Sequence, residues 1–174
     1  FKFYEVGGTV RDSLMGLQSK DIDYVVVPND ELLQQTCSVT EMFEKLLTFL
    51  NEENYMVFLV TPECYTIRAK FPPDHKYHGV ADFVLARKEV GYVEGTRQPM
   101  IVPGTLFDDL QRRDFTVNAL AKDPDTGEII DYFNGIEHLK ERILKTPISG
   151  LVTFEDDPLR LLRAIRFAIT KDFD

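Results

Sequence analysis

Short apolar runs separated by glycine, proline and polar residues recur along the first half of the chain. We expect strands at Phe1–Val6 and Asp21–Val27, because β-branched and aromatic residues dominate both segments and Pro28 ends the second. Further apolar runs lie between prolines that punctuate the chain, and they predict additional strands. These strands are Tyr55–Val60, Cys64–Lys70 and Val80–Arg87.

Other segments repeat an apolar residue every three or four positions, which predicts helices between the strands. Gly7-Gly8 is followed by a short stretch of this kind, and Thr9 is expected to cap it. Ser38 with Glu41 resembles a capping box that opens a helix reaching Leu50. The apolar positions of that second helix form a continuous stripe, so we assign the stripe to the core.

The second half of the chain is more irregular. The segment 89–104 contains three glycines and two prolines, which predicts a long mobile loop. A helix is expected over 106–117, and Pro124–Gly127 resembles the turn of a hairpin. A last helix should open at Asp157-Pro158, with proline at its first position. Strands interspersed with helices indicate a mixed α and β domain.

The composition narrows the class of protein. At 174 residues and 44% hydrophobic content, the chain can bury one sizeable core. Its apolar runs are far shorter than the about 20 residues that cross a bilayer, so no membrane span is expected. The two cysteines, Cys37 and Cys64, form neither a disulfide framework nor a zinc motif, which favours a reducing compartment, cytoplasmic or an organelle matrix. Because the chain begins in a strand and stops after a helical stretch, we expect it to be a fragment.

The charge argues against a surface that grips nucleic acid unaided. The formal net charge is −9 at pH 7, with 29 acidic and 20 basic residues. Bound divalent cations would offset part of this acidity, although acidic residues also occupy ordinary helix positions. Any extensive contact with RNA is therefore expected to lie elsewhere.

The sharpest local feature is the pair Asp21 and Asp23. Residues two apart in a strand project from the same face, so their carboxylates would lie side by side. Such a pair suits a hard divalent cation such as Mg²⁺, which binds oxygen ligands. On spacing alone a solvated strand edge is an equal alternative. The apolar residues at 22 and 24–27 favour a cleft, because they make the strand too apolar for an exposed edge.

Three further groups of residues could bind phosphate or base. Gly7 and Gly8 before a helix offer backbone N–H groups to a phosphate, with Arg11 adding charge, although a tight turn would explain the glycines equally well. Arg112 and Arg113 could also bind phosphates. On a helix, Asp114 and Asn118 would face the same way and could bracket a ribose or triphosphate, but the string alone favours a solvated ion pair.

The start of the last helix carries charges that helix stability does not explain. Asp157 is a good N-cap, but Arg160 lies in the first turn, where the helix dipole disfavours a cation. Arg163 and Arg166 repeat the charge at a spacing of three. A carboxylate beside a guanidinium could recognise the base edge that C and A share, with Asp157 accepting from the exocyclic amino group and Arg160 donating to ring acceptors.

Together these strings resemble the class II CCA-adding enzymes and bacterial poly(A) polymerases. The resemblance covers almost the whole chain, in an unchanged order of motifs. One position departs from it, since Asp156 stands where the family usually has Glu. The matching strings are Val6–Asp12 with Leu14, Gly16, Asp21 and Asp23; Asp82–Arg87; Arg112–Ala119; Asp131–Gly135 with Leu139; and Asp156–Arg160 with Leu162–Ala164 and Arg166-Phe167.

The resemblance implies a DNA polymerase β-like nucleotidyltransferase fold, with a mixed central sheet flanked by helices. Residues 1–150 would form the catalytic head, and residues 151–174 would begin a helical neck that carries the nucleotide-selecting motif. It further implies two Mg²⁺ ions, CTP and ATP as donors, and addition of nucleotides to an RNA 3′ end, first of all that of tRNA. A poly(A) polymerase and a nucleotide-binding module that has lost turnover remain alternatives.

The resemblance also gives each residue a role. Asp21 and Asp23 would hold the metal ions, and Asp82 is our choice for the third carboxylate because it lies in a strand that could approach the pair. Asp114 is the competing candidate. Nucleotide contacts are assigned to Gly7, Gly8, Arg11, Arg112, Arg113, Asp114, Asn118, Asp157, Arg160, Arg163 and Arg166.

Overall fold

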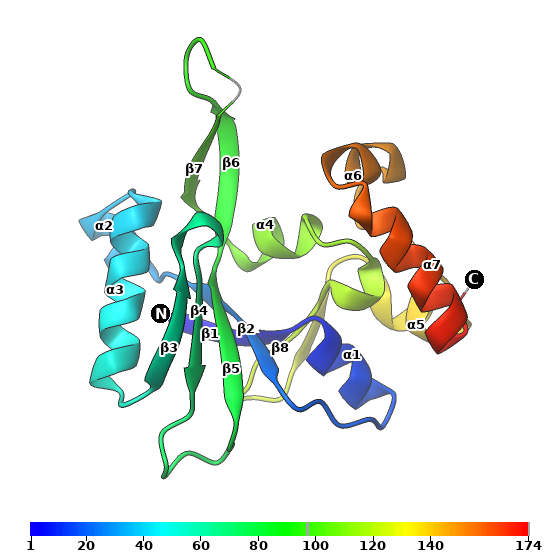
Figure 1. Cartoon of the computed structure of the whole chain (residues 1–174), viewed down its shortest axis with the longest axis horizontal. Coiled ribbons are helices and arrows are strands. Elements are labelled where there is room, and N and C mark those ends of the chain that lie inside the picture. Colours follow the sequence, from blue (N-terminus) through cyan, green and yellow to red (C-terminus); the bar gives the residue numbers. More distant parts are fainter. Residues whose placement is uncertain (97, 174) are drawn as a thin grey trace.

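The computed structural model describes residues 1–96 and 98–173 (Figure 1). A seven-stranded sheet forms its centre, and a separate two-stranded hairpin projects from it. The elements in chain order are β1 Lys2–Val6, α1 Gly8–Leu14, β2 Ile22–Val27, α2 Asp30–Gln35, α3 Val39–Glu52, β3 Met56–Thr61, η1 Pro62–Cys64, β4 Thr66–Lys70, β5 Val80–Leu85, β6 Arg87–Tyr92, β7 Pro99–Pro103, α4 Leu106–Gln111, η2 Thr116–Asn118, β8 Leu120–Lys122, β9 Ile129–Asp131, α5 Gly135–Glu141, α6 Gly150–Asp156 and α7 Leu159–Lys171.

The sheet is mixed, as the sequence predicts. Its strand order is β3-β4-β5-β2-β1-β8-β9. Strands β2 and β5 pair in parallel, whereas the other neighbours pair antiparallel. The parallel pair lies at the centre, so the residues that begin β2 and β5 are brought to the same end of the sheet. The predicted hairpin around Pro124–Gly127 is confirmed as the connection between β8 and β9.

Helix α3 covers one face of the sheet with the apolar stripe that its sequence predicts. Met42, Leu46 and Leu50 are fully buried there. They pack in one cluster with Ile67 of β4 and Phe83 of β5. Because full burial of a large apolar side chain contributes about 1.5–3 kcal/mol, this layer fixes the sheet against α3. The opposite face carries Arg68 and Lys70 of β4 and Asp82 of β5, with Val80 and Val84 on either side of Asp82.

Two smaller clusters hold the remaining helices. Leu106 and Leu110 of α4 pack with Val25 of β2. Phe167 of α7 packs edge-to-face on Phe115, with ring centroids 5.6 Å apart. Figure 1 shows the result, with α2 and α3 on one side of the sheet and α1, α5 and α7 beyond the other. None of the described helices is both long and apolar enough to cross a bilayer.

The segment 89–104 differs from the predicted mobile loop. It forms the hairpin of β6 and β7, paired from Arg87 opposite Pro103 to Tyr92 opposite Pro99. The prolines lie at the two ends of β7, where they break few ladder bonds. Gly91 has φ +141° at an irregularity in the pairing. The glycines and prolines thus mark a bulge and strand ends within a hairpin.

Three helix predictions also need correction. Helix α4 ends at Gln111, well before the predicted end at 117, and Asn118 lies in the separate turn η2. Gly7 occupies the N-cap of α1, and no side chain caps it, so Thr9 does not act as predicted. Helix α7 begins at Leu159 with Pro158 as N-cap, one residue later than expected. The short helices α2, α5 and α6 were not predicted from the sequence.

Candidate functional site

Three carboxylates gather where β2 and β5 begin. Asp23 and Asp82 are direct neighbours in the parallel register of these strands, so both side chains project from the sheet face that α3 does not cover. Asp21 lies in the bend just before β2, rather than inside the strand as predicted. Arg68 of β4 bridges the group, with its Nη2 atom 2.8 Å from the Asp21 carboxylate and its Nε atom 3.4 Å from the Asp82 carboxylate.

The environment of these acids disfavours their negative charge. Burial raises the pKa of Asp23, and the neighbouring carboxylate of Asp82 raises it further, while Arg113 opposes the shift. Burial also raises the pKa of Asp82, against the opposing effect of Arg68. Burial is the largest cause of both shifts, so the charged form of this cluster is costly without further positive charge nearby. A bound divalent cation would supply the missing positive charge.

The three carboxylates suit a Mg²⁺ ion whose remaining ligands are oxygens of a substrate. Carboxylate oxygens are the ligands that Mg²⁺ prefers, and the ion commonly takes one or two of them together with water and phosphate oxygens. Within the described residues, no three His, Cys, Asp or Glu side chains form a group that could hold an ion by themselves. Asp21, Asp23 and Asp82 would hold the ion only together with further oxygens, such as those of a triphosphate.

The glycine turn after β1 lies directly beside the acids. Gly7 has φ +67°, a conformation that favours glycine. A Cβ atom built on Gly7 would lie 3.0 Å from Nη1 of Arg113 and 4.0 Å from Oδ2 of Asp23. The turn, this arginine and this acid therefore surround one small space. Gly8 follows as the first residue of α1.

Arg11 lies beside the same turn, its Nη2 atom 3.3 Å from a Cβ atom built on Gly8. The residue is 7% exposed, and its Nη1 atom donates a 2.5 Å hydrogen bond to Oδ1 of Asn118. The guanidinium also contacts Asp12 and lies over the ring of Phe167, 5.1 Å from its centroid. Arg11 thus links α1, η2 and α7, and its contact with phosphate stays a prediction.

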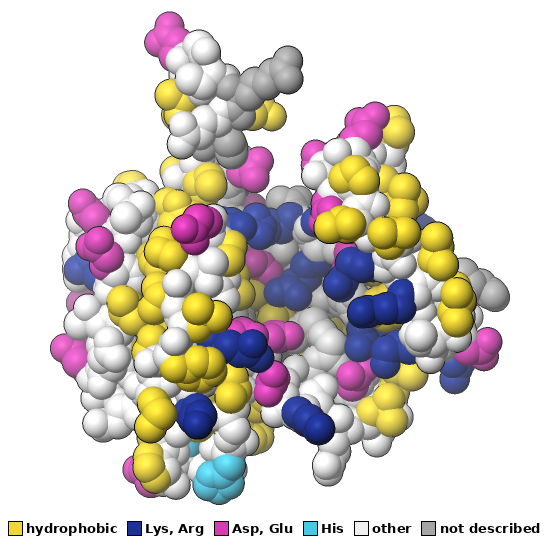
Figure 2. All heavy atoms as spheres, viewed as in Figure 1, with side chains coloured by type: hydrophobic (Ala, Val, Ile, Leu, Met, Phe, Trp, Pro, Cys, Tyr) yellow, Lys and Arg dark blue, Asp and Glu magenta, His cyan; other side chains and the backbone are white. Residues whose placement is uncertain are grey.

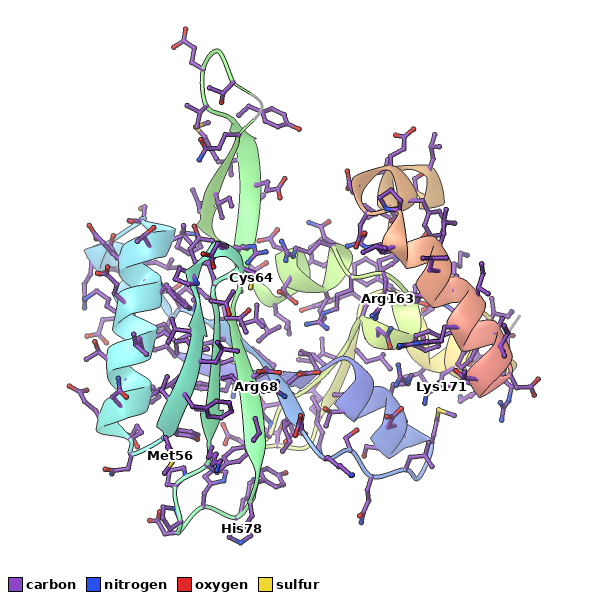
Figure 3. The ribbon with its side chains drawn as sticks, viewed as in Figure 1. Met56, Cys64, Arg68, His78, Arg163 and Lys171 are labelled. Carbon is purple, nitrogen blue, oxygen red and sulfur yellow. The ribbon has the colours of Figure 1, made fainter. Side chains whose placement is uncertain are left out.

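A cleft of about 370 Å³ opens between the sheet and α7. Six of the predicted nucleotide-binding residues line it, whereas the exposed Arg166 lies outside this set. Figure 2 shows Lys and Arg side chains gathered in the hollow between the sheet and α7, and Figure 3 shows Arg68 and Arg163 on its two sides. The cleft is lined by Val84, Asp109, Arg112, Arg113, Asp114, Asp157, Arg160 and Arg163.

Asp114 is held within the wall of this cleft. Its Oδ2 atom accepts from Arg163 at 2.7 Å, and its Oδ1 atom accepts from the backbone N–H of Phe115 and from Nδ2 of Asn118. The predicted proximity of Asp114 and Asn118 is confirmed, although no continuous helix carries them. Because these partners occupy both Asp114 oxygens, the geometry favours Asp82 over Asp114 as the third carboxylate.

Asp157 and Arg160 lie at the rim of the same cleft. Oδ2 of Asp157 is 3.9 Å from Nε of Arg160, while Oδ1 of Asp157 accepts from the backbone N–H of Leu159 at 3.1 Å. Nη2 of Arg160 donates to the carbonyl oxygen of Arg112 at 2.7 Å. This contact anchors the Arg160 guanidinium, and the remaining N–H groups stay available for a ligand. Burial lowers the pKa of Arg112, with neighbouring Arg87 adding to the effect.

Two charged residues of the site, Asp109 in the cleft and Arg68 at the carboxylates, were missed by the sequence reasoning. Asp109 is 3% exposed and pairs with Arg113 at 3.0 Å, so it orients that guanidinium. Its spacing of four from Arg113 could have suggested the pair, because helical residues four apart share a face. The sequence signal for Arg68 was weaker. Alternation along β4 predicts which face of the sheet Arg68 lies on, but it does not predict which strand pairs with β4.

The same geometry can be compared with that of known proteins. Residues 3–145 match the family model of the poly(A) polymerase head domain. The chain belongs to the poly(A) polymerase head-domain family. The matched residues include the carboxylate cluster, the glycine turn and most of the residues that line the cleft. The recognition made from the sequence motifs is confirmed.

The curated relatives include a multifunctional CCA protein and an A-adding tRNA nucleotidyltransferase. The multifunctional CCA protein of Xylella fastidiosa (strain M23) is 35% identical over 166 residues, which are 95% of this chain and 34% of that protein. The A-adding tRNA nucleotidyltransferase of Aquifex aeolicus is 36% identical over 168 residues, which are 95% of this chain and 18% of the relative. The chain therefore spans about a third or less of the length of these curated relatives.

Solved structures confirm the fold of the head domain. A tRNA nucleotidyltransferase complexed with a primer tRNA and an incoming ATP analogue has a TM-score of 0.68 at 32% identity, covering 99% of this chain and 42% of that one. The Bacillus stearothermophilus CCA-adding enzyme in complex with CTP also has a TM-score of 0.68, at 28% identity, covering 98% and 35%. The predicted nucleotidyltransferase fold is thus confirmed.

Proposed function

We propose that this chain is the catalytic head of a template-independent RNA nucleotidyltransferase that adds C, A or both from CTP and ATP to an RNA 3′ end, with tRNA as the substrate. The observation that carries the proposal is the placement of Asp23 and Asp82 as register neighbours beside the glycine turn and the arginine-lined cleft. Nucleotidyl transfer needs carboxylates for metal ions and cations for a triphosphate at one place. The primer tRNA, ATP analogue and CTP bound to the solved relatives agree with it.

In the proposed reaction, the 3′ oxygen of the RNA attacks the α-phosphorus of the nucleotide. A new phosphodiester bond forms, the bond from the α-phosphorus to the bridging oxygen breaks, and pyrophosphate leaves. Asp21, Asp23 and Asp82 would hold Mg²⁺, which when bound activates the hydroxyl and stabilises charge on the phosphates. Arg113 borders the space at Gly7 and would bind the triphosphate, held in orientation by Asp109.

The division at residue 150 remains our proposal for the domain organisation. Helix α7 packs on the head mainly through Phe167, while its large aliphatic side chains stay exposed. This arrangement fits the start of a helical neck whose first residues complete the nucleotide cleft. The cytoplasmic or matrix location predicted from the cysteines also remains a proposal. The exposed apolar side chains of α7 are Leu159, Leu161, Leu162, Ile165 and Ile169.

Extension of defined transcripts tests the proposed activity. We expect the protein to extend a tRNA transcript that lacks its terminal CCA, or one that ends in CC, and to stop at the mature end. An unlimited run of A on any RNA would instead assign a poly(A) polymerase. Nucleotide binding without extension of any transcript in Mg²⁺ would assign an inactive binding module and refute the proposal.

Replacing Asp157 should change the choice of base before it changes catalysis. In Asp157→Ala, the advantage of CTP and ATP over UTP should narrow, because one base-edge pair contributes about 1–3 kcal/mol of discrimination. Primer extension with each of the four nucleotides measures this. Asp157→Asn keeps an acceptor for the backbone N–H of Leu159 and so retains this contact at the helix end. If the Asn variant discriminates like wild type, the Ala result reflects the helix end and other residues read the base.

A further inference from the structure

The sheet face that α3 leaves open extends well beyond the acids. In the strand register, Leu59 of β3 lies opposite Arg68, Arg68 opposite Asp82, and Asp82 beside Asp23. These four residues form one row across β3, β4, β5 and β2. With strands about 4.8 Å apart, Leu59 lies roughly 10 Å from Asp82 and roughly 15 Å from Asp23. The row is therefore about as long as a few nucleotides.

The β3 end of this row exposes large apolar side chains. Met56 is 63% exposed, Phe58 52% and Leu59 51%. Met56 lies opposite Lys70 of β4, whose side chain is exposed and forms no ion pair with another described residue. We call Met56, Phe58, Leu59 and Lys70 the β3–β4 strip. Figure 2 shows hydrophobic side chains gathered over β3 beside the cleft, and Figure 3 places Met56 and Arg68 on neighbouring strands of this sheet.

The chemistry of nucleotidyl transfer determines which side of the acids the primer must use. The attacking and leaving oxygens lie roughly in line through the phosphorus. Gly7 and Arg113, which would hold the leaving pyrophosphate, lie on the β1 side of Asp23, because the glycine turn follows β1. The attacking 3′ oxygen must then approach from the opposite side, across β5, β4 and β3. That path leads over the β3–β4 strip.

We propose that the β3–β4 strip binds the last nucleotides of the RNA primer. This inference rests on the proposed function. Bases stack on the exposed ring of Phe58 and pack against Met56 and Leu59, and Lys70 binds a backbone phosphate. Stacking accepts every base, since each base has a π-face. A growing 3′ end changes its sequence at every addition, so a surface that does not discriminate between bases suits this substrate.

A second copy of the chain fits the strip less well. β3 is an edge strand, and a partner β3 could in principle pair with it. The register of β3 shifts between Val57 and Leu59, and such an irregularity disrupts regular pairing at an edge. Antiparallel self-pairing would also bring Glu53, before the strand, towards Glu63, after it, in the other copy. Both features oppose a β3–β3 dimer.

The test is the double variant Phe58→Ser with Leu59→Ser, compared with Leu33→Ser. Leu33 is 38% exposed on α2, away from the cleft face, and so controls for loss of an exposed leucine. We expect the KM for a tRNA primer to rise roughly tenfold in the double variant, because stacked contacts with one or two bases are lost. The KM for CTP should stay within about twofold of wild type, since the strip lies outside the nucleotide cleft. Leu33→Ser should change neither constant.

Binding without catalysis gives an independent measurement. A primer ending in a 3′-deoxynucleotide cannot be extended, so its affinity, measured by fluorescence anisotropy, reports binding alone. Lys70→Gln should weaken this binding and lower the slope of log affinity against log salt by about 1, as expected for the loss of one phosphate contact. Circular dichroism of each variant establishes that the sheet is intact.

Each remaining outcome has a defined meaning. Unchanged primer KM and unchanged primer binding in the folded double variant would overturn the proposal. Equal losses for primer and CTP would also overturn it, because the strip would then act through the nucleotide cleft. A shift from dimer to monomer in sedimentation, with normal primer binding, would assign the strip to a second copy. If the wild-type protein extends no RNA at all, the proposed function fails before the variants are compared.

Discussion

Asp23→Asn should reduce nucleotide incorporation at least about 1,000-fold, which corresponds to about 4 kcal/mol of transition-state stabilisation. The substitution keeps the shape of the side chain and removes the charge that would bind Mg²⁺. Asp23 is the most suitable acid to change, because it lies between the glycine turn and Asp82. Single-turnover incorporation of labelled CTP at saturating RNA measures the effect on the chemical step.

The same variant should not lose stability. Burial and Asp82 raise the pKa of Asp23 in the folded state, so the folded protein binds the proton more tightly than the unfolded chain. The free energy of unfolding therefore falls as the pH rises from the pKa of Asp23 in the unfolded chain through its pKa in the folded protein. Asn does not ionise, so Asp23→Asn removes this loss of stability. We expect Asp23→Asn to unfold at the same or a higher temperature than wild type at pH 7 in a chelator. Lower stability would indicate a structural role for Asp23.

Asp125→Asn provides the matched control for Asp23. Asp125 lies in the turn between β8 and β9, its side chain is 80% exposed, and its ion pair is with Lys2 rather than with a cleft residue. Exposed ion pairs of this kind contribute about 0–1 kcal/mol. Incorporation by Asp125→Asn should match wild type. Equal loss in both variants would show that Asp23 has no special role.

Gly135→Ala should be the most destabilising single methyl addition among the glycines near the site. A Cβ atom at this position would lie 2.2 Å from the carbonyl oxygen of Thr116 and 2.9 Å from its carbonyl carbon. Relieving this overlap must displace η2, which carries Asn118. We expect a loss of about 3 kcal/mol, or a fall of roughly 10 °C in Tm, measured by thermal unfolding.

Gly150→Ala tests whether the effect is specific to the packing at Gly135. Gly150 is the first residue of α6, and its added Cβ would meet the nearest described atoms at 3.6 Å, an ordinary contact distance. Its stability should stay within about 0.5 kcal/mol of wild type. An equally small loss of stability in Gly135→Ala would contradict the close packing of α5 against η2.

The sequence predicted the parts of the site that local chemistry determines. Alternation in a strand placed Asp23 on a polar face, and Asp82 was correctly expected to approach it from another strand. The position of the Arg11 side chain could not be predicted from such local patterns. Its charge favoured a phosphate contact, but the burial of α1 against η2 and α7 places it between Asn118 and Phe167.

Long-range pairing explains the remaining differences. Only the antiparallel register of β4 and β5 brings Arg68 opposite Asp82, and nothing local to either residue specifies that register. The segment 89–104 has a composition typical of a loop, but its two halves pair with each other as a hairpin. Asp114 was predicted as the competing third carboxylate, and the sequence could not show that α7 places Arg163 against it.

The most direct test of the proposed activity is incorporation by the wild-type protein. An RNA ending at the position before CCA is incubated with Mg²⁺ and each labelled nucleotide in turn, and the products are resolved at single-nucleotide length. We predict that CTP, ATP or both extend the RNA with release of pyrophosphate, that UTP and GTP do not, and that a chelator stops the reaction. Extension that continues undiminished in the chelator, or no extension of any RNA by folded protein, would contradict metal-dependent nucleotidyl transfer at Asp21, Asp23 and Asp82.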